Sequence, residues 1–462
     1  MGRVSLVMLA LLMGCSDDAT PRDAAADHPR AEDLGDGAVA DGPGGDVAPV
    51  DRGLADGAPG TDGPQPAQGP CPKLGAASGT IINVQPGQAQ QLPGIVASAT
   101  SGTTILLADG TYKMTGTESQ RRLTFAVPKV TLRSASGNRD KVTIDGEYKT
   151  NEIIFIRADD VTVADLTLTH AVDHLVHVTG GSATIKGTLL YNLQLVDAGE
   201  QLVKVNSDGQ GHYADQGRLE CSRIEMTAQG RPHIETNPGG CYTGGIDAHS
   251  AWGWKVRFNR FEGIHCDNGS LAEHAIHFWS ASRDTLAERN VIVDCARGIG
   301  FGLGQTGTDR TYADDPYPTV GYMGHVDGII RNNVIHAGTA VSQYFDTGIE
   351  LNQAHGVLVY HNTVVSKPTF SSIDYRFANT KAEIRDNLTF KITVRDGAQG
   401  TVDHNLQSTP SALFVDAAAV DYHLKPGASQ AIDKGVGVSE AGLDMDGEPH
   451  TAGLPDLGAD EL

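Results

Sequence analysis

Seven short segments of this chain share one pattern, in which an apolar residue is followed by a variable residue and then by another apolar or small one. The segments read DHLVHVT, GEQLVKVN, TGGIDAH, EHAIHFW, ARGIGFG, DTGIELN and FSSIDYR. Side chains alternate between the two faces of a strand, so the residue after each central Val or Ile faces outward. In stacked parallel strands that position forms one column of His177, Lys204, Asp247, His277, Gly300, Glu350 and Asp374. Six of the seven can ionise, so we expect function on this face.

Asparagine recurs at the head of short apolar strands, which indicates a repeating coil. From Asn259 onward the spacings of about 18 to 43 residues scatter around about 25, as in a solenoid with loop insertions. The longer gap from Asn192 to Asn259 holds two coils. An Asn side chain at a corner can bond the backbone of neighbouring coils. The predicted set is Asn192, Asn259, Asn290, Asn333, Asn362, Asn387 and Asn405.

The strand patterns, 56 glycines and the scarcity of helical periodicity predict an all-β fold. We expect residues 71–462 to form one parallel β-helix solenoid. Residues 75–115 form its N-terminal cap, with a helix at 90–99 over the first coil, because an open end exposes unpaired backbone groups. Residues 418–462 form a loop-rich closing segment.

The N-terminus is predicted to be a targeting segment. Residues 1–15 contain a basic start, a short apolar run and the sequence Leu-Met-Gly-Cys. This segment resembles a bacterial lipoprotein signal, which implies cleavage before Cys15, acylation of that residue, export and anchoring to the outer membrane or cell surface; an ordinary secretory signal is the alternative. Residues 16–70 hold 12 acidic residues and 3 Arg with no aromatic residue, so we expect a disordered tether.

Residues 75–462 resemble the right-handed parallel β-helix proteins of the pectate-lyase-like superfamily. The resemblance is carried by the repeated strands, the corner asparagines and the cap. It implies the fold and a polysaccharide substrate, whereas the activity has to come from the site residues themselves.

Five cysteines follow Cys15, and export permits disulfides. Cys266 and Cys295 follow Asn259 and Asn290 at similar distances, which places them at one corner of consecutive coils. We therefore expect a Cys266–Cys295 disulfide. A Cys221–Cys241 disulfide would close the intervening loop and leave Cys71 unpaired. No spacing of Cys and His predicts a structural zinc site.

The chain has a formal net charge of −22, of which −14 falls on the folded part. This field disfavours nucleic acid, whose phosphates require a basic surface. An anionic polysaccharide is also repelled at long range, unless a local basic patch or a bound cation such as calcium reverses the sign. We expect the protein to act as a monomer.

Three insertions surround the column, at residues 207–217, 228–243 and 303–324, and would form walls around it. Stacked strands lie about 4.8 Å apart. Lys204 and Asp247 on adjacent coils would then keep each other charged, which leaves a histidine as base. Aromatic side chains nearby suit either sugar stacking or packing of the loops. The expected substrate contacts are Asp247, His274, Trp279, Arg283, Tyr312 and Asn206.

Two reactions fit such a cleft. A lyase removes the proton beside a uronate carboxylate, so it needs a cation and a base. The candidate cations are Arg231, Lys204 and Arg283, and the candidate bases are His249, His277 and His274. A glycosidase needs two carboxylates about 5–9.5 Å apart. Glu350 and Asp374, one coil apart, are the candidate pair.

The column also resembles the chondroitinase B and alginate lyase family, which places a Lys base on one coil and an Arg on the next. The resemblance implies a role for Lys204, with Glu200 and Asn206 as cation ligands. Asp247 and His249 stand where that Arg is expected. A further alternative is a divalent metal held by Asp247, His249 and His277.

The sequence therefore predicts an exported, lipid-anchored β-helix protein that cleaves a uronate-containing polysaccharide by β-elimination. The alternative from another class is a non-catalytic surface protein that binds glycans or proteins through the same face. A further alternative is that these polar side chains are simply solvated.

Overall fold

A computed structural model describes residues 71–462, apart from 238–239, 305–309, 339–344, 367–369 and 452. The predicted signal segment, the lipidation site Cys15 and the tether of residues 16–70 lie outside the described residues. Within the described part, none of the helices is both long and apolar enough to cross a membrane.

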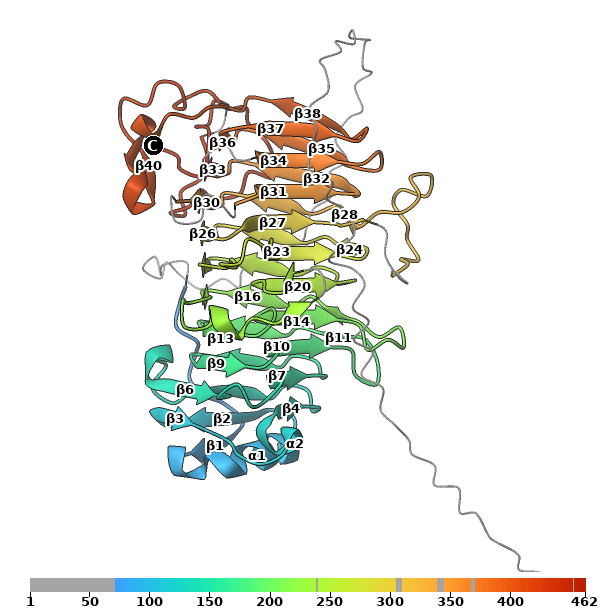
Figure 1. Ribbon diagram of the computed structural model, residues 1–462, viewed down its shortest axis with the longest axis vertical. Coiled ribbons are helices and arrows are strands. Elements are labelled where there is room, and N and C mark those ends of the chain that lie inside the picture. The colour runs from blue at the N-terminus through green and yellow to red at the C-terminus, as the bar shows by residue number, and fades with distance from the viewer. Residues whose placement is uncertain (1–70, 238–239, 305–309, 339–344, 367–369, 452) are drawn as a thin grey trace, which may run out of the picture.

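Short strands stack along the long axis of the molecule and form a right-handed parallel β-helix, as the sequence predicts (Figure 1). Each full coil contributes one strand to each of three sheets, here named A, B and C. Every strand pair within these three sheets is parallel. Inward-facing Val, Ile and Leu side chains from all three sheets are buried in one continuous core up to the last coil, so each coil is stabilised by its neighbours.

Sheet C carries the predicted column and has ten strands. In spatial order its strands are β4 (Leu123–Phe125), β7 (Glu152–Ile156), β10 (His174–Thr179), β14 (Val203–Asn206), β20 (Ile246–His249), β23 (His274–Trp279), β27 (Arg297–Phe301), β31 (Thr347–Asn352), β34 (Ser371–Arg376) and β37 (Ile392–Arg395).

Sheets A and B complete each coil, with 14 and 10 strands. Sheet A contains β1 (Thr80–Val84), β2 (Thr103–Leu107), β5 (Thr131–Ser134), β8 (Thr162–Ala164), β12 (Leu189–Tyr191), β16 (Arg218–Glu220), β21 (Lys255–Arg257), β24 (Ser282–Arg283), β25 (Leu286–Glu288), β28 (His325–Val326), β29 (Ile329–Arg331), β32 (Ala354–Tyr360), β35 (Lys381–Arg385) and β38 (Gln399–Asp403). Sheet B contains β3 (Gly110–Tyr112), β6 (Val142–Asp145), β9 (Thr167–Ala171), β13 (Gln194–Ala198), β17 (Arg223–Glu225), β22 (Arg260–Glu262), β26 (Val291–Val293), β30 (Val334–Ala337), β33 (Thr363–Ser366) and β36 (Leu388–Thr389).

Smaller elements lie outside the three sheets. The pairs are β11 (Ile185–Lys186) with β15 (Ala214–Asp215), β18 (Thr236–Asn237) with β19 (Gly240–Cys241), and β39 (Phe414–Asp416) with β40 (Asp421–Leu424). The helices are η1 (Pro86–Gln91), α1 (Leu92–Ser98), α2 (Glu118–Arg121), η2 (Arg139–Lys141), η3 (Arg231–His233), η4 (Ser411–Leu413) and η5 (Ala417–Ala419). The predicted N-terminal helix is thus α1, and its buried Leu92 and Val96 cover the first coil.

A ladder of buried asparagines joins six consecutive coils at the corner between sheets A and B. Each side-chain Oδ1 accepts from the backbone N–H and from the Nδ2 of the preceding member, at 2.8–3.2 Å. The members are Asn259, Asn290, Asn333, Asn362, Asn387 and Asn405. Asn192 was wrongly predicted to belong, because it lies one residue early, at the left-handed corner position (φ 49°), and bonds Asp165. Ser222 occupies the ladder position in the coil before Asn259.

The ladder predicts a graded loss of stability. Asn333→Ala removes the acceptor for two buried donors of Asn290, so the free energy of unfolding should fall by about 2–4 kcal/mol in urea titrations. Asn405→Ala is the matched comparison, since Asn405 ends the ladder and is only half-buried, and its loss should be clearly smaller. Equal losses at the two positions would contradict this role.

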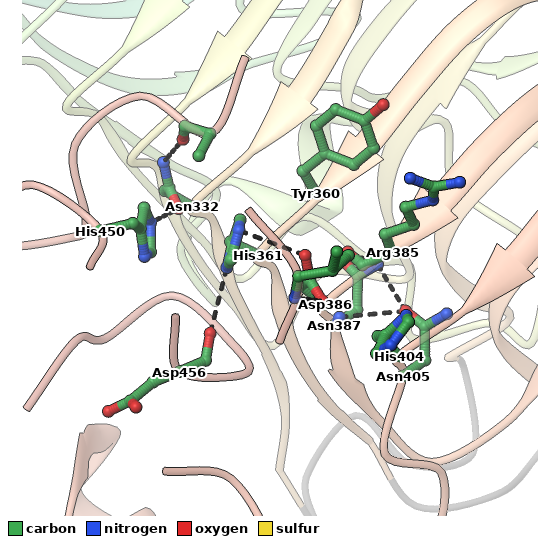
Figure 2. Close-up of polar contacts among 12 residues, drawn as sticks. Asn332, Tyr360, His361, Arg385, Asp386, Asn387, His404, Asn405, His450 and Asp456 are labelled. Atoms are coloured by element: carbon green, nitrogen blue, oxygen red, sulfur yellow. Dashed lines mark hydrogen bonds and ion pairs between the residues drawn. The ribbon is translucent and has the colours of Figure 1, made fainter. Parts of the chain in front are cut away.

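The closing segment packs along the flank of sheet B rather than over the end of the solenoid (Figure 1). Val394 and Val402, on the last two strands, stay 55% and 38% exposed. The segment is held by left-handed corner residues of successive coils (Figure 2). Asn332 contacts His450 at 3.0 Å, and Nδ1 of His361 lies 3.2 Å from the carbonyl of Asp456.

The predicted disulfides are wrong. The structure pairs Cys71 with Cys221 and Cys241 with Cys266, at Cα–Cα distances of 5.7 and 6.1 Å, and leaves Cys295 as a buried thiol. The backbone N–H of the residue after Cys295 bonds the carbonyl of Ile264, so Cys295 aligns with Ile264 and points into the core.

The expected Cys221–Cys241 disulfide fails because these residues lie on different sides of the coil. Cys221 follows β16 of sheet A, whereas Cys241 precedes β20 of sheet C. Cys71 reaches Cys221 because the segment before β1 runs along sheet A, where Leu74 packs against Tyr191 and Cys221.

Candidate active site

The seven aligned segments become neighbouring strands of sheet C, and they pair in the predicted register. Each column residue is the direct partner of the next, so residues nearly 200 positions apart in the chain lie in one file. The pairs are His177 with Lys204, Lys204 with Asp247, Asp247 with His277, His277 with Gly300, Gly300 with Glu350 and Glu350 with Asp374.

A buried cluster surrounds the carboxylate of Asp247. Lys204 Nζ forms an ion pair with its Oδ2 and lies 3.0 Å from His249 Nε2, which is itself 3.0 Å from Oδ2. Trp279 Nε1 donates to Oδ1 at 2.7 Å. His277 Nδ1 lies 3.6 Å from the same oxygen. Four of the predicted site residues therefore converge on Asp247.

The column is not solvated, which rules out the simplest alternative. Lys204, Asp247 and His277 are 7%, 3% and 1% exposed. The side chain of His249 is 26% exposed and is the most accessible member of the cluster.

Charges within the cluster fix its protonation. Burial would lower the pKa of Lys204, but Asp247 and the nearby Tyr242 and Glu200 raise it above its usual value. Burial would raise the pKa of Asp247, but Lys204 and His249 hold it well below 3.8. Burial and the Lys204 charge lower the pKa of His249 below 6.5. Near neutral pH the cluster contains an ammonium, a carboxylate and a neutral imidazole.

The alternative metal site at Asp247, His249 and His277 does not fit this arrangement. The ammonium of Lys204 contacts both Asp247 Oδ2 and His249 Nε2, so a cation already occupies the space between them. Two positive ions cannot share that position.

His274 lies beside the cluster but is completely buried. Its ring centroid is 4.4 Å from that of His277, and its Nε2 lies 2.9 Å from Glu350. The ring covers Gly300, where an added Cβ would meet Nε2 at 2.6 Å. The glycine is required by this close approach, and a direct substrate contact by His274 is blocked by its 1% exposure.

The two carboxylates proposed for a glycosidase are neutralised by other groups. Glu350 lies 2.9 Å from His274 and 3.9 Å from Arg297. Arg395 donates to both oxygens of Asp374, at 3.0 and 2.6 Å. With Glu350 at 6% and Asp374 at 1% exposure, neither carboxylate reaches a substrate in this structure.

Arg231 does not join the Lys204 cluster. It donates to the carbonyls of Met226 and Gly263, pairs with Asp267, and lines a separate cavity of about 260 Å³.

Arg283 and Tyr312 also lie apart from the Lys204 cluster. Arg283 pairs with Asp314 and lies 5.1 Å from the Tyr312 ring, while Tyr312 donates to a carbonyl at 2.9 Å. Trp254 is fully buried in the core. The contacts of Tyr312 and Asp314 therefore hold the 310–324 part of the insertion against the coils. Asn206 instead contacts His177 Nε2 at 3.0 Å.

Sequence reasoning missed two neighbours of the column and gave a third, Glu200, only a partial role. Tyr242 lies close enough to raise the pKa of Lys204, and Glu273 lies 3.5 Å from His277. Both precede their strands, outside the aligned positions. Glu200, expected only as a cation ligand, groups its carboxylate with those of Asp173 and Glu235. Burial and mutual repulsion raise the pKa of Glu200 to about 7 and that of Asp173 to about 6.

Comparison with known proteins identifies the fold. No protein-family model and no curated protein sequence matches the chain. Among solved structures, pectate lyase Pel9A matches 84% of this chain and 97% of its own, at 14% identity and a TM-score of 0.50. An alginate lyase from Paenibacillus sp. str. FPU-7 matches 71% of this chain and 99% of its own, at 15% identity and a TM-score of 0.46. The chain has a pectate-lyase-like parallel β-helix fold. At these identities the likeness extends to the fold alone.

Proposed function

We propose that this protein is an exported, lipid-anchored polysaccharide lyase that cleaves a uronate-containing glycan by β-elimination. The observation that carries the proposal is the cluster of Lys204, Asp247 and His249 on the outer face of sheet C. It supplies a protonated ammonium and a neutral imidazole at one place, held by a shared carboxylate.

The reaction assigns one role to each of these groups. His249 takes the proton from C5 of the uronate, the C5–H electrons form the C4=C5 double bond, and the C4–O4 bond breaks. A neutral imidazole is the form a general base requires near neutral pH. Lys204 stabilises the negative charge that develops on the uronate carboxylate. A proton returns to O4 as it leaves.

Elimination fits this site better than hydrolysis because the column offers no free pair of carboxylates. A glycosidase needs one carboxylate that is protonated or able to attack the sugar. Glu350 and Asp374 are instead paired with Arg297 and Arg395 inside the column.

Calcium is the cation that this chain fits beside the cluster. The carboxylates of Asp173, Glu200 and Glu235 bring three oxygens within 4.8 Å of one another, and calcium prefers oxygen ligands. A calcium ion there would lower the raised pKa values of Glu200 and Asp173 and offset the negative charge that repels a uronate.

Activity on a panel of uronate polymers tests the proposal. The wild-type protein should produce an absorbing unsaturated product, with and without added calcium as separate arms. His249→Ala and Lys204→Met should each lower kcat by about 10²–10⁴-fold, because each removes a group that acts in the transition state.

The matched control is His212→Ala. His212 is also paired with a carboxylate, Asp208 at 2.7 Å, but it lies in the 207–217 insertion and is not a member of the Lys204 cluster. Its activity should equal that of the wild type. If no polymer yields an unsaturated product, with or without calcium, the lyase proposal is wrong.

The pH profile gives a second test. Because the base must be neutral and its pKa is lowered below 6.5, kcat/KM should fall on the acid side with a midpoint below pH 6.5 and stay level above it. In Lys204→Met the ammonium no longer depresses the His249 pKa while Asp247 still raises it, so the residual acid limb should move to higher pH. If the acid limb stays at the same pH in Lys204→Met, Lys204 does not control the pKa of the base.

A non-catalytic glycan-binding protein is the second candidate. The low exposure of Lys204 and Asp247 favours it, since a catalytic group must reach its substrate. Retention on an immobilised uronate polymer without product formation would identify this function.

Export and anchoring rest on the sequence of residues 1–15, and the two disulfides in the described residues fit an oxidising compartment. Metabolic labelling with a fatty acid in a bacterial host should therefore label the wild-type protein. Cys15→Ser should abolish the label, and Cys295→Ser, the matched cysteine change, should retain it. A label that persists in Cys15→Ser contradicts the anchor.

A further inference from the structure

Three donor atoms from one turn and strand converge beside the cluster described above. Glu273 Oε2 lies 3.9 Å from Nδ1 of His274 and 3.5 Å from Nδ1 of His277. One ligand atom from each of the three residues lies within 4.8 Å of the other two. The segment reads EHAIH, in which Glu273 precedes β23 and the two histidines lie on it.

Neither Nδ1 atom has a hydrogen-bond partner, although both histidines are about 99% buried. A buried nitrogen without a partner is costly, so such atoms are rare unless a ligand completes them. Nδ1 of His277 lies 3.5 Å from Glu273 Oε2 and 3.6 Å from Asp247 Oδ1, and Nδ1 of His274 lies 3.9 Å from Glu273 Oε2. A bound ion would therefore reach both nitrogens from the side of the Glu273 carboxylate.

The opposite nitrogen of each imidazole is already held. Nε2 of His274 lies 2.9 Å from Glu350, and Nε2 of His277 lies 3.2 Å from the carbonyl of Gly302. A carboxylate or carbonyl partner fixes the proton on Nε2 and directs the lone pair of Nδ1 outward from it. This is the usual arrangement around a histidine that binds a metal.

The spacing suits a small divalent ion. Ligand atoms about 2.0–2.2 Å from zinc in tetrahedral geometry are about 3.4 Å from one another. The two distances from Glu273 Oε2, 3.5 and 3.9 Å, are within a few tenths of an ångström of that value. The side chain of Glu273 is 21% exposed, which gives an ion a route from solvent and leaves a position for water.

We propose that Glu273, His274 and His277 bind a divalent transition-metal ion of the zinc type. The site lies next to the Lys204 cluster but does not depend on its being a lyase. It also differs from the metal site expected from sequence, because it replaces Asp247 and His249 with Glu273 and His274.

The donor set distinguishes this ion from calcium. Two imidazole nitrogens and one carboxylate suit zinc and the neighbouring first-row metals, whereas calcium takes oxygen ligands. The carboxylates of Asp173, Glu200 and Glu235, which offer only oxygen ligands, form a separate group in the segments that precede strands β10, β14 and β18. The two sites should therefore bind different metals, a zinc-type ion at the first and calcium at the second.

Zinc titration of the untagged full-length protein, stripped with a chelator, tests the proposal by calorimetry. The wild type should bind one Zn²⁺ per chain at this site, and excess Ca²⁺ should not displace it. Glu273→Gln should weaken zinc binding by at least about 10²-fold, since loss of even an outer partner of a ligand costs about 10–100-fold.

The matched control is His423→Ala. It removes the histidine from the other His-containing group of the described residues, His423 with Asp446 and Asp460, and should leave the affinity unchanged. Zinc affinity that is lost in His423→Ala and kept in Glu273→Gln overturns the proposal.

X-ray absorption at the zinc edge of the wild-type complex gives a test without mutation. Two imidazole ligands and oxygen neighbours are expected. A spectrum with fewer than two imidazoles overturns the site even if Glu273→Gln fails to fold. Neither measurement uses polysaccharide, so the metal result can be interpreted even if the lyase assay fails.

Discussion

Parallel pairing of sheet C in a single register is the constraint on which the rest of this structure depends. Because side chains alternate with a period of two, a slip of one residue would turn the whole ionisable column inward and the apolar side chains outward. Two features oppose such a slip. The inward Val and Ile side chains fill one continuous core, and the asparagine ladder bonds six consecutive coils, from Asn259 to Asn405, at the corner opposite sheet C.

Stacking at about 4.8 Å places each ionisable side chain next to another one. Opposite charges are paired at two places in the column: Lys204 with Asp247, and Asp374 with Arg395 from the next strand. Buried ion pairs of this kind contribute little net stability, because desolvation offsets the attraction, but removing one partner is costly. The pairing also sets the chemistry, since Lys204 both neutralises Asp247 and keeps His249 uncharged.

Much of this arrangement could be predicted from sequence because it follows from local periodicity. The strand pattern predicted the column with correct pairs from His177 to Asp374, and six of the seven predicted corner asparagines belong to the ladder. Features that depend on the path of loops could not be obtained in this way. Cys71 meets Cys221 only because the first segment runs along sheet A, and the expected Cys266–Cys295 pair fails on a shift of two residues in alignment.

Periodicity also fails around Gly300. The side chain of His274, from the preceding coil, lies across this glycine, which the alternation of faces does not predict. That side chain begins its strand, where the backbone leaves the preceding turn and simple alternation no longer gives the direction. His274 also carries one of the two unpartnered nitrogens of the proposed metal site. Strand periodicity therefore fails to place a residue that the proposed metal site needs.

The acidity of the folded part, −14 by sequence, remains the main physical objection to an anionic substrate. It applies to the long-range field, which salt screens within about 8–10 Å, and not to the contacts of the site. There, Lys204 and His249 hold the pKa of Asp247 well below its usual value, so its carboxylate is ionised beside the ammonium of Lys204. A divalent ion at Glu273, His274 and His277 would add positive charge next to this cluster. Such an ion would offset part of the negative field around an anionic substrate, so the proposed metal site and the proposed lyase site are compatible.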